Sequence, residues 1–236
     1  MGEYIRRLYC AILTAAGFFA YGVPAVAAYP YFYLTGFKEN EVRSFIYYIS
    51  RFCMGCVKRT TKSFCVEGAL PTDAAIIVAN HGSILDILCF CCFGSKDYVF
   101  VTKGWASAVP IMRRYIRTAG YICSDENGSF EDMVSAAKTI FAKGLKLVIF
   151  PEGTRSADGT VGRFHSGAFL LAARCNVPII PVALKGLDRV IAKRQIMAKG
   201  GSVVRLSMLL PCKADNDHLR MARAVKEQIV KKLSEV

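Results

Sequence analysis

The sequence predicts an α/β fold: a mixed sheet flanked by helices, with an N-terminal helical membrane anchor. Two observations lead to this prediction. Residues 8–37 carry no charged side chain, whereas short apolar runs from residue 74 onward alternate with amphipathic helical patterns. Alternation of this kind is typical of strands covered by helices. We therefore expect residues 1–62 to form membrane-anchoring helices and residues 63–236 to form one α/β domain, for which the length is sufficient.

The uncharged segment at residues 8–37 is long enough to cross a bilayer as a helix. Pro24 and Pro30 are expected to break that helix, because proline removes a backbone donor. Residues 42–57 have apolar side chains at steps of three and four, which predicts an amphipathic helix. Cations on both sides of the uncharged segment favour a kinked or re-entrant anchor in one leaflet, and a single span is the alternative. These cations are Arg6, Arg7, Arg43, Arg51, Lys58, Arg59 and Lys62.

The elements after the anchor are predicted from periodicity. Runs rich in apolar and β-branched residues predict strands, at residues 74–79, 98–102, 121–123, 146–150, 179–184 and 203–208. Apolar residues at helical spacing predict helices, at residues 83–93, 129–143, 166–174 and 218–233. Two of these helices begin with the spacing of a capping box, Ser83 with Asp86 and Ser129 with Asp132.

Composition narrows the class of partner. The chain is 53% hydrophobic and carries a formal net charge of +13, so it suits an anionic membrane or a phosphorylated substrate. No nucleic-acid-binding motif is present, which argues against nucleic acid as a partner; a basic surface without a particular partner is the alternative. Ten cysteines lie mostly in apolar stretches and are expected to be reduced thiols in a cytosolic setting. Cys53 and Cys56 form a lone C-x-x-C pair, and no metal is expected.

The strongest local signal is the segment 80–86, which reads Asn-His-Gly-Ser-Ile-Leu-Asp. It joins the end of a predicted strand to the start of a helix through a glycine turn. The chain can fold back there so that the Asp86 carboxylate meets one ring nitrogen of His81, which leaves the other nitrogen free to act as a general base. The alternative, equally weighted on these residues alone, is that Asp86 only caps the helix and His81 is a turn residue.

A second signal is the segment 150–156, Phe-Pro-Glu-Gly-Thr-Arg-Ser, directly after an apolar strand. Ligands collect at the carboxyl ends of strands in open α/β sheets. A turn at this place can expose backbone N–H groups, and Arg155 can hold an anion through two hydrogen bonds. An ordinary turn with a solvated arginine is the alternative.

Together these segments resemble the glycerolipid acyltransferase family, which includes the 1-acylglycerol-3-phosphate (lysophosphatidic acid) acyltransferases. The N-H-x-x-x-x-D motif corresponds to residues 80–86, the F-P-E-G-T-R-S motif to residues 150–156, and the V-P-I-x-P-V motif to residues 177–182. Order and spacing match, and the resemblance covers roughly residues 64–208.

The resemblance implies direct transfer of a fatty acyl group from a thioester to the hydroxyl of 1-acylglycerol-3-phosphate, which forms phosphatidic acid. His81 is then the catalytic base and Asp86 its orienting partner. No cofactor is implied, because acyl-CoA or an acyl carrier protein thioester is the co-substrate. The implied location is the cytoplasmic face of the inner or an intracellular membrane. The implied partners are the membrane lipid substrate and the bilayer, with acyl carrier protein as a further option. The implied substrate-binding residues are Lys103, Glu152, Gly153, Thr154 and Arg155.

One position departs from the family. Its G-x-I-x-x-D-R motif corresponds to residues 120–126, and Glu126 stands where the family has arginine. Arg113, Arg114 and Arg117 could supply the missing charge, or form a solvated basic face. Two alternatives therefore stay open: an acyltransferase for another acceptor, such as a lyso-ornithine lipid, a lysophospholipid or a glycolipid, and a non-catalytic lipid-binding membrane protein.

Overall fold

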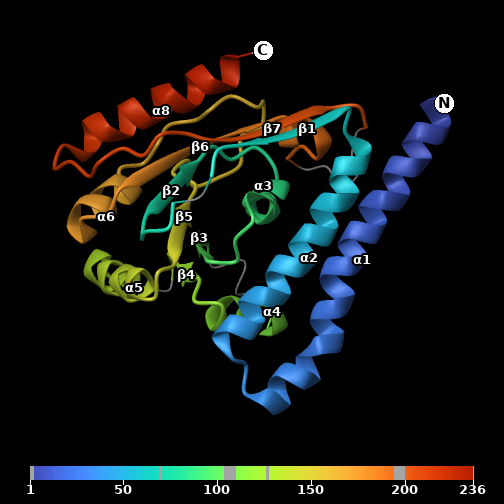
Figure 1. The fold of residues 1–236 in the computed structure, drawn as a ribbon, viewed down its shortest axis with the longest axis horizontal. Helices are drawn as coiled ribbons and strands as arrows, with labels where there is room; N and C mark the ends of the chain where they lie inside the picture. The colour runs from blue at the N-terminus through green and yellow to red at the C-terminus, as the bar shows by residue number, and fades with distance from the viewer. Residues whose placement is uncertain (1–2, 70, 104–109, 126–127, 194–199, 236) are drawn as a thin grey trace.

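In a computed structural model, helices and strands alternate along most of the chain, and residues 3–69, 71–103, 110–125, 128–193 and 200–235 are described (Figure 1). The helices are α1 (Glu3–Thr35), α2 (Glu39–Thr60), α3 (Leu85–Leu88), α4 (Pro110–Thr118), α5 (Phe130–Ala142), α6 (Gly167–Cys175), α7 (Leu187–Val190) and α8 (His218–Ser234), with a 3₁₀ helix η1 (Cys89–Phe93). The strands are β1 (Ser63–Glu67), β2 (Ile76–Ala79), β3 (Tyr98–Thr102), β4 (Ile122–Cys123), β5 (Lys146–Ile149), β6 (Ile179–Lys185) and β7 (Val203–Met208).

Within these described ranges, seven strands form one sheet in the order β1-β7-β6-β2-β5-β3-β4. Most neighbouring strands run parallel, and β6 and β7 are antiparallel. The predicted mixed sheet is therefore confirmed. The carboxyl ends of β2 and β5 lie side by side, because Val78 pairs with Ile149. This register brings the two segments that follow these strands, residues 80–86 and 150–156, to one edge of the sheet.

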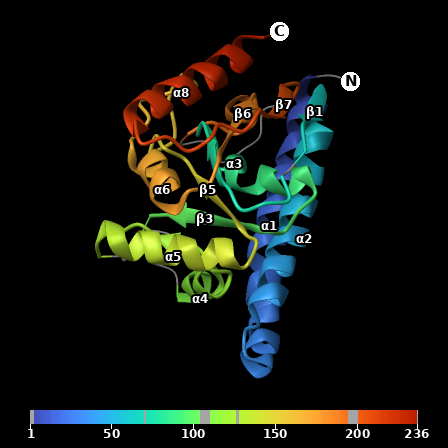
Figure 2. The ribbon, with the colours of Figure 1, turned by 60° about the vertical axis from the view of Figure 1, so that its left-hand side comes forward.

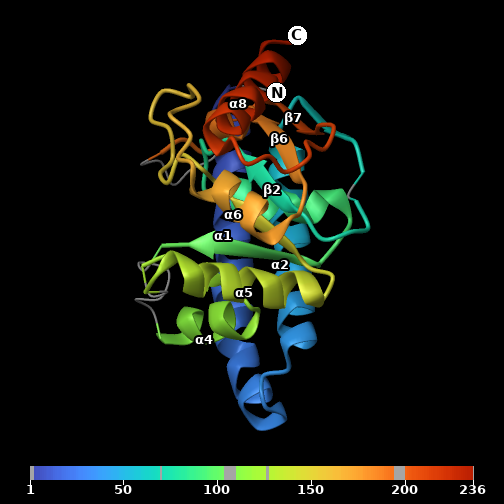
Figure 3. The ribbon, with the colours of Figure 1, turned by 90° about the vertical axis from the view of Figure 1, so that its left-hand side faces the viewer.

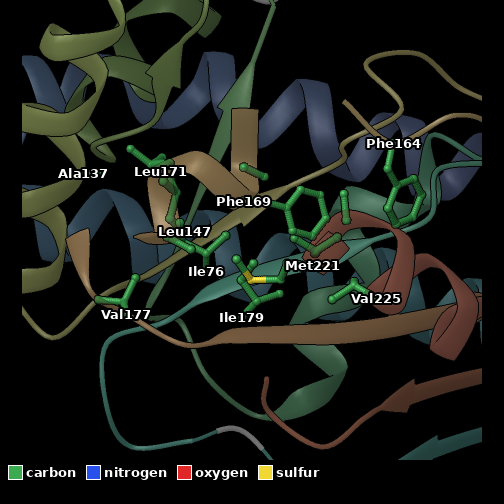
Figure 4. Close-up of a cluster of buried hydrophobic side chains, with 14 of the residues drawn as sticks. Ile76, Ala137, Leu147, Phe164, Phe169, Leu171, Val177, Ile179, Met221 and Val225 are labelled. Carbon is green, nitrogen blue, oxygen red and sulfur yellow. The ribbon is translucent and has the colours of Figure 1, made fainter. Parts of the chain in front are cut away.

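Helices cover both faces of the sheet, which gives three layers. Ile76 and Val78 pack toward α5, α6 and α8, whereas Ile77 and Ala79 pack toward α2, α3 and η1. This alternation follows from the two-residue period of a strand. Figure 3 shows α5 and α6 on one side of the strands and α1 and α2 on the other. Figure 4 shows the first of these cores, where Phe169 lies among the side chains of β2, β6 and α8.

The first two helices form a hairpin that extends beyond the sheet (Figures 1 and 2). Residues Leu8–Thr35 of α1 are long and apolar enough to cross a membrane, and only 14% of the most apolar stretch is buried inside the protein. The predicted break at Pro24 and Pro30 is wrong, because α1 continues through both prolines. A proline removes only its own N–H donor, and the packing of α1 against α2 supports the turns on either side.

An aromatic cluster fastens the hairpin to the α/β domain. The ring of Tyr115 on α4 lies edge-on to Phe32 at 5.6 Å and stacks on Phe45 at 5.7 Å, and its hydroxyl donates to the carbonyl oxygen of Ala25 at 2.8 Å. Aromatic pairs of this kind prefer these geometries. The guanidinium of Arg114 lies 4.8 Å from the Phe37 ring centroid, a cation–π distance. One member of the predicted arginine cluster thus holds the hairpin in place.

The hairpin also contributes to the main core. Met54 and Val57 of α2 are buried against the sheet, so α2 is part of the packed structure as well as part of the predicted anchor. The helix ends at Thr60 and β1 begins at Ser63, which is where the domain boundary was predicted. The division into two domains stays a prediction.

Local differences from the predicted elements are few. The capping box of α5 is present, since Ser129 and Asp132 exchange hydrogen bonds. The helix predicted at residues 83–93 divides into the short α3 and the 3₁₀ helix η1. The capping box predicted for Ser83 and Asp86 is wrong, because Ile84 is the N-cap of α3 and Ser83 Oγ accepts from the N–H of Leu85 in place of that of Asp86. Three elements were not predicted: the edge strand β1 and the helices α4 and α7.

Candidate active site

The site begins with Asn80 at the end of β2. Its buried side chain donates from Nδ2 to the carbonyl oxygen of Leu184 at 2.9 Å, and its Oδ1 accepts from the Leu184 N–H at 2.8 Å. The asparagine amide thereby imitates a further pair of strand hydrogen bonds to β6. Asn80 fixes the point at which the chain leaves the sheet, and so positions His81.

His81 and Asp86 are hydrogen-bonded, as the sequence predicts. His81 Nδ1 lies 2.8 Å from Asp86 Oδ2. The same oxygen accepts from the N–H groups of Gly82 at 2.7 Å and Ser83 at 2.8 Å. Asp86 is 1% exposed, so its charge is held by these three donors rather than by water.

The predicted pair is present, whereas Asp86 does not cap α3, because its backbone donors Gly82 and Ser83 precede that helix. The carboxylate satisfies the backbone donors of the turn, and it also binds the histidine ring. A carboxylate on Nδ1 favours the tautomer with a proton there, which leaves Nε2 with a lone pair. His81 Nε2 makes no hydrogen bond to any residue in the described ranges. Ser83 fixes the turn from the other side, because its hydroxyl donates to the carbonyl oxygen of Ile191 at 2.7 Å.

The segment after β5 supports His81 through three contacts. The Phe150 ring stacks on the imidazole with 4.2 Å between centroids. Ser156 N–H donates to the His81 carbonyl oxygen at 2.7 Å. Glu152 Oε1 accepts from the His81 N–H at 2.9 Å, while its Oε2 accepts from the Gly162 N–H at 2.8 Å. The two predicted motifs thus form one connected structure around the imidazole.

A cavity of about 880 Å³ opens beside His81, between the α1–α2 hairpin and the sheet. Most of its wall is apolar. The wall includes Leu13, Cys53, Val57, Ile84, Leu85, Ile87, Leu88, Phe100, Val101, Met112, Ile116, Met133, Ile149, Phe150 and Ile191. Of the described residues that line the cavity, none is aspartate or glutamate.

The end of the cavity near His81 is basic. Lys103 and His165 both approach Gly153: Lys103 Nζ lies 3.9 Å, and His165 Nε2 4.0 Å, from the position that a Cβ on Gly153 would take. Gly153 has a φ of +66°, a left-handed conformation that glycine adopts without strain. Arg155 and Lys193 line the same cavity. Lys193 Nζ also donates to the Arg155 carbonyl oxygen at 2.6 Å, which fixes the turn.

The predicted substrate-binding residues divide into two groups. Lys103, Gly153, Thr154 and Arg155 all line the large cavity. Glu152 is buried and lies behind His81, where it borders a separate cavity of about 140 Å³. Since both of its oxygens already accept backbone hydrogen bonds, this geometry gives Glu152 a positioning role, and its contact with a substrate phosphate stays a prediction. Glu126 lies outside the described residues.

Two basic residues of the cavity were not predicted, His165 and Lys193. Neither belongs to a recognised motif, and each lies in a loop rather than directly after a strand. His165 could have been found from its position just before the helical pattern at residues 166–174. The sequence offers no comparable signal for Lys193.

The cavity also contains two thiols, Cys53 and Cys56. Burial raises the pKa of the Cys53 thiol to about 11, so this thiol stays protonated at neutral pH and is a weak nucleophile. In the part of the chain that the structure describes, no three His, Cys, Asp or Glu side chains gather as metal ligands.

A comparison with protein families decides the classification of this site. The family model described as Acyltransferase matches residues 63–185, which is more than half of the chain. The chain belongs to the acyltransferase family. The matched region contains the His81–Asp86 pair and the whole of the segment 150–156, so the two connected motifs lie inside the family domain.

Curated relatives of this acyltransferase-family chain are named 1-acyl-sn-glycerol-3-phosphate acyltransferases. A chloroplastic enzyme of Brassica napus is 32% identical over 117 residues, 49% of this chain and 34% of the relative. A chloroplastic enzyme of Arabidopsis thaliana, LPAT1, is 33% identical over 118 residues, 49% of this chain and 33% of the relative. The alpha enzyme of Mus musculus is 30% identical over 138 residues, 53% of this chain and 45% of the relative. The chain thus spans between a third and a half of these relatives.

A solved structure extends the likeness of the acyltransferase fold to nearly the whole chain. The crystal structure of the 1-acyl-sn-glycerophosphate (LPA) acyltransferase PlsC from Thermotoga maritima superposes with a TM-score of 0.77 at 23% identity. The superposition covers 98% of this chain and 99% of the PlsC chain. The α1–α2 hairpin and the mixed sheet are therefore a shared architecture.

Proposed function

We propose that the protein is a membrane-bound O-acyltransferase that moves a fatty acyl group from an acyl thioester to the hydroxyl of 1-acylglycerol-3-phosphate, forming phosphatidic acid. One observation carries this proposal: the His81–Asp86 pair borders a cavity that is basic beside the imidazole and apolar elsewhere. A lysophospholipid acceptor and an acyl donor combine the same two properties, an anionic group and long apolar chains.

In the proposed reaction, His81 Nε2 takes the proton of the acceptor hydroxyl as the oxygen attacks the thioester carbonyl. Asp86 keeps Nδ1 protonated and stabilises the imidazolium that forms. Collapse of the tetrahedral intermediate breaks the carbon–sulfur bond, and the imidazolium returns its proton to the leaving thiolate. The new ester, the free thiol and a neutral His81 remain. No acyl-enzyme is required.

The basic end of the cavity supports an acceptor that carries phosphate. Arg155 and Lys103 present cations there, and a guanidinium can bind phosphate through two hydrogen bonds. The N-terminus of α6 faces the same space through Gly167 and Ala168, where backbone N–H groups favour an anion. The names of the curated relatives support the same acceptor.

The apolar part of the cavity supports binding of an acyl chain. Its wall combines Leu13 and Gly17 of α1 with Val57 of α2 and Leu88 of α3, so a chain lying there is shielded from water on several sides. Burial of methylene groups in such a space contributes about 0.8 kcal/mol each.

The hairpin supports attachment to a membrane. The outer side of α1 exposes large apolar residues, and α2 adds Tyr48 and Phe52. We propose that these side chains enter the lipid from the cytoplasmic face, in one leaflet or as a span, so that the cavity opens toward its substrates.

A second candidate acts on a different acceptor, such as a lyso-ornithine lipid, another lysophospholipid or a glycolipid. Glu126 favours it, because this residue replaces an arginine of the family motif. An uncharged acceptor such as a glycolipid without phosphate would make no ionic contact with the cations of the cavity.

The experiment that tests these proposals is an acceptor panel. Purified protein in neutral vesicles is given acyl-CoA, or an acyl carrier protein thioester, with each acceptor in turn, and release of free thiol is measured. We expect release that depends on 1-acylglycerol-3-phosphate and exceeds release with monoacylglycerol. Preference for an uncharged or ornithine acceptor would support the second candidate. If thiol release does not depend on any acceptor, the protein is a lipid-binding protein without transferase activity.

A further inference from the structure

His165 occupies a defined place at the basic end of the cavity. Its backbone N–H donates to the carbonyl oxygen of Pro151 at 2.9 Å, which joins the loop before α6 to the turn after β5. The imidazole Cδ2 lies 3.7 Å from the position that a Cβ on Gly153 would take. The ring is thereby held over Gly153, in the segment that the proposed function assigns to the acceptor phosphate.

The polar atoms of this ring have no partner within the described part of the chain: His165 makes no side-chain hydrogen bond there, and it is exposed at the cavity mouth. His81, by contrast, is fixed by Asp86 and stacked on Phe150. A histidine that only fills the core would be buried and hydrogen-bonded. His165 is instead available to a ligand in the cavity.

The charges around His165 are mostly positive. Glu152 is directed away, since its oxygens accept from the N–H groups of His81 and Gly162. Ser124, which also lines the cavity, donates to Asp125 at 2.9 Å. The groups that face this end from each neighbouring element are His81 before α3, Lys103 after β3, Arg155 after β5 and Lys193 after α7, and Arg163 is an exposed cation on the same loop.

We propose that His165 contacts the phosphate of the acceptor and that its protonation determines how tightly the acceptor binds. This inference rests on the proposed function. An imidazolium can donate a charge-assisted hydrogen bond to a phosphate oxygen, whereas a neutral imidazole offers a weaker bond or a lone pair that repels the anion.

The two histidines of the site then act on different kinetic parameters. His81 accepts the proton of the acceptor hydroxyl, so it acts on kcat. His165 holds the phosphate best as an imidazolium, so it acts on KM for the acceptor. Since histidine is the side chain that changes charge between about pH 5 and 8, acceptor binding is expected to weaken across this range as pH rises.

The test compares wild type with His165→Gln from pH 6 to pH 8.5, with the acceptor in neutral vesicles. The second ionisation of the phosphate affects both proteins equally, so the ratio of their KM values isolates His165. We expect KM for 1-acylglycerol-3-phosphate to be raised about tenfold by the substitution at pH 6 and to equal that of wild type at pH 8.5. His165→Lys, charged throughout, is expected to give a KM whose ratio to wild type falls as pH rises. For both variants kcat should stay within about twofold of wild type, because neither removes the base.

Controls separate the inference from the function on which it rests. Arg163→Gln removes a cation from the same loop outside the cavity, and it should leave KM unchanged. Three results would overturn the role of His165. Arg163→Gln could raise the acceptor KM as much as His165→Gln does, or His165→Gln could change KM for the thioester in place of the acceptor. The third result is a ratio of the acceptor KM of His165→Gln to that of wild type that does not vary with pH. Failure of wild-type protein to acylate 1-acylglycerol-3-phosphate at any pH would instead overturn the proposed function.

Discussion

The backbone N–H of His81 donates to Glu152 Oε1 at 2.9 Å. A carboxylate from the segment after β5 thus holds the backbone of the residue at the end of β2, while Asp86 holds its ring. The backbone and the side chain of His81 are fixed by different acids. Glu152 also accepts from the N–H of Gly162, so a single side chain connects the loop after β2 with two points of the loop between β5 and α6.

The first prediction follows from that connection. Glu152→Gln keeps the size of the side chain but replaces one acceptor by a donor, so one of the two backbone N–H groups loses its partner. An unpaired buried donor costs about 1–3 kcal/mol, and we expect kcat to fall about tenfold with little change in KM for the acceptor. Steady-state kinetics with both substrates varied provides the measurement. A rise in acceptor KM at constant kcat would instead place Glu152 against the phosphate.

The second prediction concerns the base. His81→Ala should lower kcat by about 10²–10⁴-fold, the usual effect of removing a general base. Asp86→Asn should also be severe, because an uncharged amide does not stabilise the imidazolium. Both variants should still sediment with vesicles, since the hairpin is untouched. Turnover near that of wild type in purified His81→Ala would exclude His81 as the base.

Arg155 is the subject of the third prediction. A charged hydrogen bond contributes about 1.5–3 kcal/mol, so Arg155→Ala should lower kcat/KM for a phosphate acceptor by about ten- to a hundredfold. Arg155→Lys should recover only part, because an ammonium cannot form two parallel hydrogen bonds. Monoacylglycerol, which has no phosphate, serves as the comparison and should lose much less. Equal losses with both acceptors would assign Arg155 to the donor or to the structure.

The fourth prediction tests membrane attachment with two matched leucines. Leu34 near the end of α1 is 83% exposed, and Leu210 after β7 is 84% exposed. Leu34→Glu should weaken binding to vesicles, because a charge then enters the apolar phase. Leu210→Glu makes the same change at equal exposure away from the hairpin and should have no effect. Vesicle flotation measures both, and equal behaviour of the two variants would contradict attachment through α1.

The fifth prediction concerns the core shown in Figure 4. Phe169 on α6 is completely buried between the sheet and α8. Phe169→Ala should destabilise the fold by about 3–5 kcal/mol, the usual cost of removing a buried aromatic ring. Leu219→Ala on the exposed side of α8 should cost less than about 0.5 kcal/mol. Thermal unfolding in detergent, followed by circular dichroism, compares the two variants.

Much of the fold could be predicted because its signals are local. The apolar runs that became β2, β5 and β6 are buried on both faces of the sheet, and such strands have continuous apolar sequences. The edge strand β1 was missed because its residues are half-buried or exposed, which leaves no apolar run to recognise. The antiparallel direction of β7 relative to β6 could not be predicted. The residues of a strand do not determine its direction, which depends on the connection before it.

The site divides in the same way. His81 and Asp86 lie five residues apart, so their contact could be inferred from one turn. The hydrogen bond between Glu152 and His81 joins residues 71 positions apart, and the sequence did not predict it. The break predicted at the prolines of α1 is wrong, because it followed from a local rule alone. Packing of α1 along α2 keeps the helix continuous. His165 and Lys193 reach the cavity through tertiary structure alone.

The position of α1 has one further consequence. Leu13 and Gly17 line the cavity from one side of this helix, while Ile12 and Phe19 are exposed on another. If α1 lies in lipid as proposed, a single helix thickness separates the reacting groups from the acyl chains of the bilayer. An acceptor then reaches the imidazole by lateral diffusion in two dimensions and never passes through water. The quantity that sets the rate is the mole fraction of acceptor in the membrane, and its bulk molarity has no direct meaning for this protein.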